Sequence, residues 1–218
     1  MFFKDRADAG GKLAAKLENK AVTWQNPLIL ALPRGGIVVA AEIARALKIP
    51  MTAFIVRKLG APGNPEFAIG AIAEGGAMVL SPEWSVDDPH VRDTIRRKTE
   101  RIKRYAALYR GSAPLPSLGG RTLLLVDDGA ATGATIKAAL KVLCAMEEPP
   151  AKLIVALPVA PPRTVKELRT LADEVVVLHS PTEFFAVSQF YSDFADSPDD
   201  VLRSLAKDTS LGETGGAK

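Results

Sequence analysis

The chain has 218 residues, of which 47% are hydrophobic and 24% are charged, and this composition predicts a globular protein that can bury a full core. The formal net charge of +3 does not point to nucleic acid as a partner, and no apolar run approaches the roughly 20 residues that span a bilayer. The single cysteine, Cys144, excludes a disulfide framework, and the N-terminus lacks a signal-peptide pattern, so we expect a cytoplasmic protein. His90 and His179 lie far apart and no cluster has the spacing of metal ligands, so we expect no metal held by the protein alone.

Apolar spacing in the first part of the chain predicts helices and strands in alternation. Residues 1–20 have the pattern of a short amphipathic helix, residues 28–32 that of a buried strand, and residues 37–48 that of a second helix. A second strand is expected at residues 52–56. Residues 59–67 contain two prolines, two glycines and an asparagine, and this composition predicts a loop.

The remainder of the chain continues the alternation. Residues 68–73 and 77–80 are predicted to pair as a hairpin. Asp88 and Pro89 resemble the N-cap and first residue of a helix that runs to about residue 109. The later elements are expected to be a strand at 123–126, a helix to about 146, a strand at 152–157, a helix at 163–172 and a strand at 174–178.

Strands that alternate with helices predict an α/β fold, in which a mostly parallel sheet lies between helices on both faces. The predicted hairpin is an insertion in this pattern. We expect one domain over residues 1–208, with its core at about 21–180, and a disordered tail at 209–218.

The most specific segment is Leu-Leu-Leu-Val-Asp-Asp-Gly-Ala-Ala-Thr-Gly-Ala-Thr at residues 123–135. Asp127 and Asp128 follow a buried strand, where they can accept hydrogen bonds from adjacent sugar hydroxyls. The loop after them lacks bulky side chains, so backbone N–H groups can approach a phosphate at the start of the next helix. A ribose 5-phosphate needs this set of contacts. The alternative is a capped turn without a ligand, but two adjacent acids at a strand end are costly to bury there.

This segment resembles the phosphoribosyl pyrophosphate (PRPP) signature of type I phosphoribosyltransferases. The strings at residues 32–36, 56–60 and 126–129 also resemble a bacterial subgroup of predicted phosphoribosyltransferases, which implies no particular acceptor. The resemblance implies the three-layer α/β/α fold of the family, with a hood over the site built from residues 1–20 and 181–208. It implies that Asp127 and Asp128 bind the ribose and that the 5-phosphate is bound by the loop residues Gly129, Ala130, Ala131, Thr132, Gly133 and Thr135.

The same resemblance implies an activity and its cofactor. Such enzymes transfer ribose 5-phosphate from PRPP to a nitrogen nucleophile, here a nucleobase or similar heterocycle, and release pyrophosphate. Mg²⁺ would be held mainly by PRPP rather than by a protein cage. The alternative is a protein that senses PRPP, or binds a nucleotide, without turnover. We leave open whether the chain forms a homodimer.

Two groups of residues resemble the pyrophosphate site of the family. Gly35 and Gly36 let backbone N–H groups approach an anion, and Arg34 adds a charge and a planar donor fork. The resemblance also implies a cis peptide bond before Arg34. Arg57 and Lys58 correspond to a pair that begins a mobile loop and reaches pyrophosphate in orotate-type relatives. The alternatives are an ordinary strand-to-helix turn and two solvated charges.

The acceptor site is less defined. Hypoxanthine–guanine enzymes have an acid at the position of Ala131, so 6-oxopurine chemistry is disfavoured. By analogy with adenine-type relatives, Glu66 would reach the acceptor when its loop closes and act with Arg57 and Lys58, although it could instead cap the hairpin. Aromatic residues of the hood could stack on the acceptor or form the hood core: Phe184, Phe185 and Tyr191.

The helix predicted at residues 91–110 carries eight basic residues against two acidic ones. An RNA-binding face and a solvated surface are both compatible with this pattern. No aromatic-rich nucleic-acid motif accompanies it, so we do not expect nucleic acid as a partner.

Overall fold

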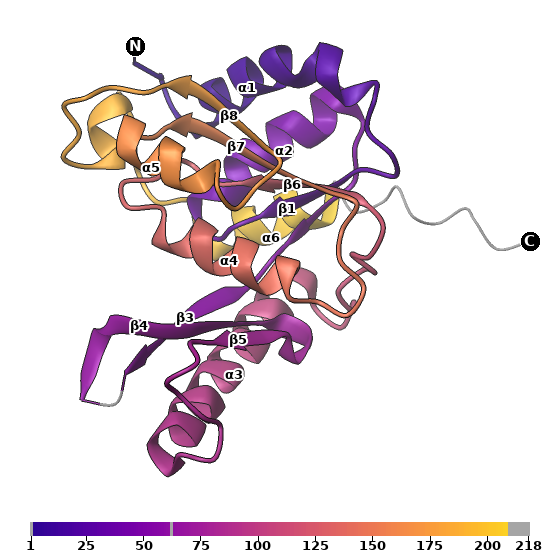
Figure 1. Ribbon diagram of the computed structural model, residues 1–218. Helices are drawn as coiled ribbons and strands as arrows, with labels where there is room; N and C mark the ends of the chain where they lie inside the picture. Colours follow the sequence, from indigo (N-terminus) through magenta and orange to yellow (C-terminus); the bar gives the residue numbers. More distant parts are fainter. Residues whose placement is uncertain (1, 62, 209–218) are drawn as a thin grey trace, which may run out of the picture.

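The computed structural model describes residues 2–61 and 63–208, and its centre is a five-stranded parallel sheet (Figure 1). The strand order is β2-β1-β6-β7-β8, and every neighbouring pair is parallel. The strands are β1 (Leu28–Ala31), β2 (Met51–Ala53), β6 (Thr122–Val126), β7 (Lys152–Val159) and β8 (Glu174–His179). The mostly parallel sheet predicted from the sequence is therefore confirmed.

Helices cover both faces of this sheet because its strands are apolar on both sides. In β1, Ile29 and Ala31 join one buried cluster and Leu28 and Leu30 join the other, since successive residues of a strand point to opposite faces. Residues of α1 (Arg6–Ala21) and α2 (Gly35–Leu47) belong to the first cluster. Residues of α4 (Ala134–Cys144) and α5 (Pro162–Leu168) belong to the second. The result is the three-layer α/β/α arrangement.

A second lobe projects from the main sheet, as the lower part of Figure 1 shows. It combines an antiparallel sheet of order β3-β4-β5 with the long helix α3 (Pro89–Arg110). Its strands are β3 (Val56–Ala61), β4 (Asn64–Ala73) and β5 (Met78–Leu80), and the short helix η1 (Glu74–Gly76) joins the last two. Asp88 caps α3 as predicted, because its carboxylate accepts hydrogen bonds from the N–H groups of His90 and Val91.

The loop predicted at residues 59–67 is wrong. β3 and β4 run through most of this segment and form the two arms of a ribbon, so the insertion is larger than the predicted hairpin. The ladder is irregular there: Gly60 pairs with Ala68 and Ala61 pairs with Asn64, with register shifts between them. Pro65 falls within this irregular stretch, where a strand tolerates a residue that has no N–H group.

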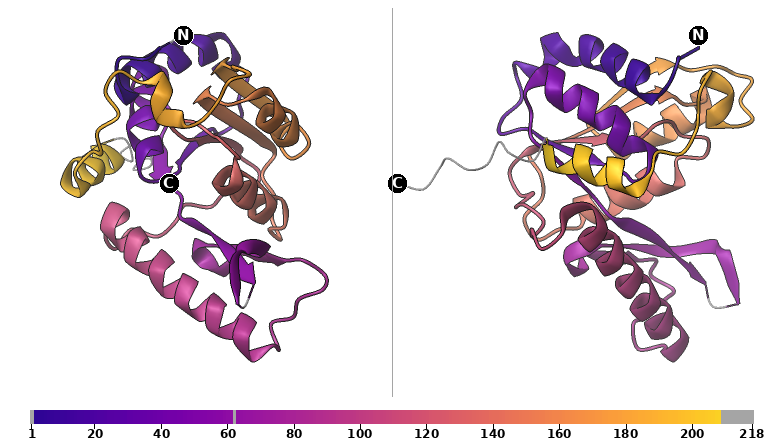
Figure 2. Two further views of the ribbon diagram at one scale, coloured as in Figure 1. Left: turned by 90° about the vertical axis from the view of Figure 1, so that its left-hand side faces the viewer. Right: turned by 180° about the vertical axis from the view of Figure 1, so that it is seen from behind.

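The two ends of the chain meet on the main domain. Phe3 forms a bridge with Tyr191, beside the short helix η2 (Val187–Phe190). The rest of the first twenty residues differs from the expected hood, because α1 packs against α2 and Leu13 enters the main core. The last helix, α6 (Asp199–Asp208), packs against α2 and α3 (Figure 2).

The predicted tail at residues 209–218 lies outside the described residues. Within the part of the chain that is described, no helix is both long and apolar enough to cross a membrane.

Candidate active site

Two loops meet at the carboxyl edge of the main sheet, because β1 and β6 are neighbours. A Cβ atom on Gly35 would overlap Oδ2 of Asp128, and one on Gly36 would lie 2.7 Å from the carbonyl oxygen of Val126. Only glycine fits at either position. The peptide bond between Pro33 and Arg34 is cis, as the resemblance implied. The structure thus brings the predicted pyrophosphate loop into contact with the predicted ribose-binding acids.

Asp127 and Asp128 lie side by side at the end of β6, and both are partly buried. The N–H group of Asp128 donates to Oδ1 of Asp127 over 2.9 Å. Loss of solvent, together with the neighbouring charge of Asp128, raises the pKa of the Asp127 carboxyl well above its usual range. Burial also raises the pKa of Asp128, although Arg6 opposes that shift. Buried, perturbed carboxyls of this kind are characteristic of functional sites.

Arg6, at the start of α1, holds Asp128 in place. Its Nε donates to Oδ2 of Asp128 over 2.7 Å, and its Nη1 donates to the carbonyl oxygen of Ala195 over 2.9 Å. Its guanidinium also lies 3.8 Å from the ring centroid of Phe194. The sequence analysis did not identify Arg6, and no local pattern could have done so, because 122 positions separate it from Asp128.

Of the two roles expected for Tyr191, the structure favours packing in the core of the hood over stacking on an acceptor. Its hydroxyl donates to the carbonyl oxygen of Asp128 over 2.6 Å, and its ring packs against Phe3 and Phe194 with centroids 5.2 and 5.0 Å apart. The side chain is buried, so it supports the signature rather than presenting a stacking surface to an acceptor. Phe184 packs on Phe190, whereas Phe185 is 89% exposed.

The predicted phosphate loop is held by contacts with residues that lie later in the chain. Gly129 has φ of +153°, and a Cβ atom there would lie 2.6 Å from Val187. The N–H group of Ala130 donates to the carbonyl oxygen of Val159, and the Thr164 hydroxyl donates to that of Ala131 over 2.6 Å. The loop then enters α4 through Gly133, which has no side chain to cap the helix. The N–H group of Ala134, the first residue of α4, donates to the Thr132 hydroxyl over 3.4 Å, so the N-terminus of this helix lies next to the loop, as a phosphate site requires.

Arg34 is engaged by the C-terminal segment, which we define as residues 194–199. Its Nη1 donates to Oδ1 of Asp199 over 2.7 Å, and its Nη2 donates to the carbonyl oxygen of Ser197 over 2.8 Å. Both side chains of the ion pair are partly exposed, at 40% for Arg34 and 45% for Asp199. A carboxylate and a carbonyl thus occupy the donors that were predicted to hold pyrophosphate.

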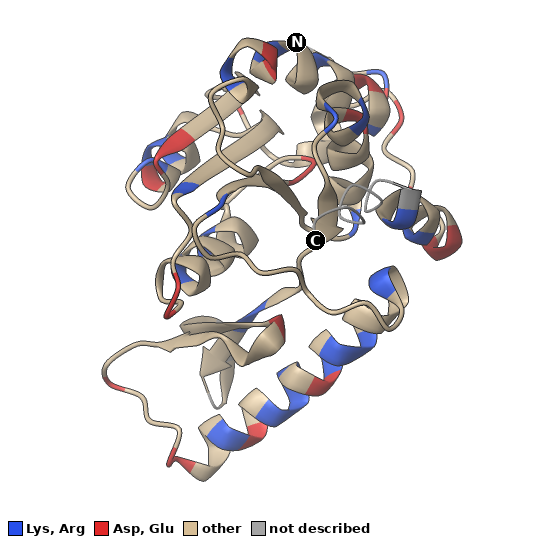
Figure 3. Cartoon of the chain, turned by 90° about the vertical axis from the view of Figure 1, so that its right-hand side faces the viewer, with Lys and Arg blue, Asp and Glu red and all other residues tan. Residues whose placement is uncertain are grey.

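Basic residues gather between β3 and α3, and Figure 3 shows Lys and Arg along the length of this helix. The Arg57 guanidinium lies 4.9 Å from the ring centroid of Tyr105 on α3. Burial and the nearby charges of Arg101, Arg57 and Lys58 lower the pKa of Lys98. Because cations repel one another, such a cluster is favourable next to an anion.

Glu66 lies in β4, and its side chain is outside the described part of the chain. Among the residues that the structure describes, no group of three or more His, Cys, Asp or Glu side chains is arranged to hold a metal ion. The paired carboxylates of Asp127 and Asp128 offer the oxygen donors that Mg²⁺ prefers. Burial raises the pKa of both carboxyls, and a nearby cation would oppose that shift.

Comparison with known proteins agrees with this geometry. The sequence profile of the family described as "Phosphoribosyl transferase domain" matches residues 3–195. Proteins of two Mycobacterium tuberculosis strains, CDC 1551 / Oshkosh and ATCC 25618 / H37Rv, are provisionally named phosphoribosyl transferases and are 43% identical over 208 residues. This match covers 92% of the chain but 45% of each relative, so the chain spans less than half of their length.

A crystal structure from Thermus thermophilus superposes with a TM-score of 0.85 at 41% identity, and the match covers 96% of this chain and 100% of the other. Both the sequence profile and this structure extend over most of the residues that form the sheet and its two loops. The chain therefore belongs to the phosphoribosyl transferase domain family.

Proposed function

We propose that this protein transfers ribose 5-phosphate from PRPP to a nitrogen nucleophile and releases pyrophosphate. The contact between the loop at Gly35 and the carboxylate of Asp128 carries this proposal. It joins a loop suited to pyrophosphate with acids suited to ribose. The family match supports a PRPP-dependent transferase in general terms.

Each part of PRPP has a complementary part of the site. The carboxylates of Asp127 and Asp128 accept hydrogen bonds from the two ribose hydroxyls, and their raised pKa values would fall toward normal as those bonds form. The loop at residues 129–135 and the start of α4 hold the 5-phosphate. Gly35, Gly36 and Arg34 receive the pyrophosphate on the opposite side of the crevice.

The reaction breaks the bond between C1 of the ribose and a pyrophosphate oxygen and forms a bond from C1 to the acceptor nitrogen. Positive charge develops on the ribose and negative charge on the departing pyrophosphate. Arg34, Arg57 and Lys58 would stabilise the departing group, and the loops would exclude water. Mg²⁺, held mainly by PRPP oxygens, would neutralise further charge on the pyrophosphate.

The acceptor is proposed to be a nucleobase or similar heterocycle other than guanine or hypoxanthine. Ala131 offers no acid at the position where 6-oxopurine enzymes have one, and its carbonyl oxygen is held by Thr164. Glu66 stays a candidate acid–base group on the β3–β4 ribbon.

Calorimetry with PRPP and Mg²⁺ tests the proposal. Asp127→Asn combined with Asp128→Asn should abolish measurable PRPP binding, since each lost charge-assisted hydrogen bond costs about 1.5–3 kcal/mol. The matched control is Glu147→Gln with Glu148→Gln, which removes two adjacent exposed acids and should leave PRPP affinity unchanged. Unchanged affinity in the aspartate variant would reject the proposal.

A PRPP-sensing protein without turnover is the second candidate, because Asp199 and Ser197 occupy Arg34 in the described state. Pyrophosphate release, measured for a panel of nucleobases with PRPP and Mg²⁺, separates the two. Release with one of the bases identifies an enzyme, whereas tight PRPP binding without release from any base favours the sensor.

A further inference from the structure

Among the residues that the structure describes, two buried hydroxyl groups lack a hydrogen-bond partner. In the described ranges, 2–61 and 63–208, the buried side-chain N and O atoms without a partner are Nε1 of Trp24, Oγ1 of Thr52 and the hydroxyl oxygen of Tyr109. Thr52 is 4% exposed and Tyr109 is fully buried. A buried hydroxyl without a partner is costly, so each one calls for an explanation.

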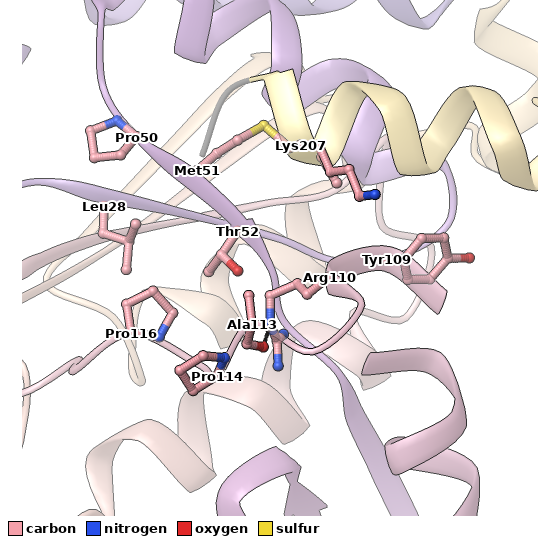
Figure 4. A pocket seen from close by; sticks show the side chains of 11 residues that line it. Leu28, Pro50, Met51, Thr52, Tyr109, Arg110, Ala113, Pro114, Pro116 and Lys207 are labelled. Carbon is pink, nitrogen blue, oxygen red and sulfur yellow. Dashed lines mark hydrogen bonds between the residues drawn. The ribbon is translucent and has the colours of Figure 1, made fainter. Parts of the chain in front are cut away.

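Thr52 and Tyr109 line the same cavity but face in different directions. The cavity has a volume of about 270 Å³ and lies between β2, the end of α3 and the end of α6 (Figure 4). The Thr52 hydroxyl points toward the side chain of Arg110, whereas the Tyr109 hydroxyl points the other way, out of this part of the cavity (Figure 4). The cavity therefore does not account for the Tyr109 hydroxyl.

Tyr109 lies where α3 meets α6, the helix that begins at Asp199, since Nε of Arg203 on α6 donates to the carbonyl oxygen of the neighbouring Leu108 over 3.1 Å. The charges that act on the Tyr109 hydroxyl are those of Asp199, Arg34 and Arg57. The ring of Tyr109 stacks on that of Tyr105, with centroids 6.2 Å apart, and Tyr105 in turn carries the Arg57 guanidinium. Burial and the nearby Asp199 raise the pKa of Tyr109, so its hydroxyl keeps its proton and is available as a donor.

In the described state, Asp199 occupies the Arg34 donors that are proposed to bind pyrophosphate. Its carboxylate and the Ser197 carbonyl oxygen both accept from Arg34, so the C-terminal segment occupies the position of an anion. A pyrophosphate group that takes both of these Arg34 donors must displace Asp199, and that displacement would loosen the start of α6, which packs against the helix that carries Tyr109.

We propose that Tyr109 is a further pyrophosphate-binding residue, whose hydroxyl donates to a pyrophosphate oxygen held between Arg34 on the main domain and Arg57 on the second lobe. This inference rests on the proposed function. It assigns α3 a direct part in binding the leaving group and gives the partnerless hydroxyl a use.

Calorimetry on Tyr109→Phe tests the inference, because this substitution removes only the hydroxyl. We expect pyrophosphate and PRPP to bind about tenfold more weakly, as for the loss of a hydrogen bond to a charged group. Ribose 5-phosphate should bind as in the wild type, because it lacks the pyrophosphate. The midpoint of thermal unfolding should not fall, because the lost hydroxyl has no partner in the folded protein.

Thr52→Val is the matched control, since it removes the other buried, partnerless hydroxyl, and pyrophosphate affinity should not change. Wild-type pyrophosphate affinity in Tyr109→Phe would overturn the inference. If Arg34→Ala then binds pyrophosphate weakly, the proposed function survives and only the role of Tyr109 is rejected. If the wild type binds no pyrophosphate, or Arg34→Ala binds it unchanged, the proposed function fails as well.

Discussion

The carboxylate of Asp127 lowers the stability of the folded protein at neutral pH. This carboxylate is desolvated and lies next to a second acid, and both effects raise its pKa. The folded protein therefore binds a proton that the unfolded chain has released at the same pH. Stability falls as the pH rises from the unfolded-state pKa, about 4, through the higher folded-state pKa.

Asp127→Asn should accordingly stabilise the ligand-free protein. We expect a gain of about 0.5–2 kcal/mol at pH 7, with PRPP affinity lost at the same time. The gain should shrink as the pH is lowered toward 4, because wild-type Asp127 then becomes protonated and neutral. Denaturant unfolding at several pH values measures this. A variant that is less stable than the wild type at pH 7 would contradict it, and Asp87→Asn, at an exposed acid, should leave stability unchanged.

Residues of the site were predictable from the sequence only where they lie next to one another in the chain. Asp127 and Asp128 are adjacent, directly after an apolar run, and the sequence therefore shows both the acids and their setting. Arg6 acts across 122 positions and looks like any basic residue of an amphipathic helix. Tyr191 was noticed as an aromatic residue, but its bond to the carbonyl oxygen of Asp128 depends on how the chain ends pack.

At the level of elements, the spacing of apolar residues predicted most helices and strands. This works because a helix or strand that is buried on one or both faces has apolar residues at regular intervals in the sequence. The β3–β4 ribbon was missed because its tip combines prolines and glycines, which usually indicate a loop. The pairing of β3 with β4 near this tip has shifts in register, and the sequence of one strand alone does not show how it pairs with the other. β2 and β3 were predicted as one strand at residues 52–56, although they belong to two different sheets.

The link between the C-terminal segment and Arg34 leads to a prediction about Asp199. Because its carboxylate would compete with pyrophosphate for Arg34, Asp199→Asn should tighten pyrophosphate binding. A partly exposed ion pair contributes about 0.2–1 kcal/mol, so we expect a gain of up to about fivefold by calorimetry. Asp200→Asn makes the same change in charge at the next, exposed residue and should have a smaller effect. Equal effects of the two substitutions would show that net charge alone is responsible.

At the scale of the whole molecule, the residues proposed to bind pyrophosphate come from both the main domain and the second lobe. Arg34 belongs to the main domain and Arg57 to the second lobe, within which Glu74 and Arg110 form a buried ion pair. Arg110 also donates to the carbonyl oxygen of Ala53 over 2.8 Å, at the end of β2. A ligand that bridges Arg34 and Arg57 would hold the two parts together.

Hydrogen exchange should detect this bridging. Pyrophosphate is expected to slow amide exchange in β3 and α3 and to speed exchange at the start of α6, because Asp199 loses its contact with Arg34. Ribose 5-phosphate is the matched ligand and should slow exchange mainly at residues 129–135. Protection by pyrophosphate that is confined to residues 129–135 would contradict a site shared by the two lobes.

The layered α/β architecture was predictable because alternating elements leave few ways to cover a parallel sheet. The division into two lobes was not, since the basic face of α3 is compatible with a solvated surface until the position of β3 is known. The place of α1 in the main core was missed for a similar reason: an amphipathic helix shows which face is buried but not against which partner.

The meeting of the two chain ends bears on how the site forms during synthesis. Arg6 is made 189 positions before its partner Ala195, and Tyr191 is made only shortly before Ala195. A growing chain that already contains Arg6 and residues 123–135 still lacks Tyr191, which binds the carbonyl oxygen of Asp128, and Ala195, which holds the Arg6 guanidinium. The ribosome must therefore make the chain as far as Ala195 before all of these contacts can form.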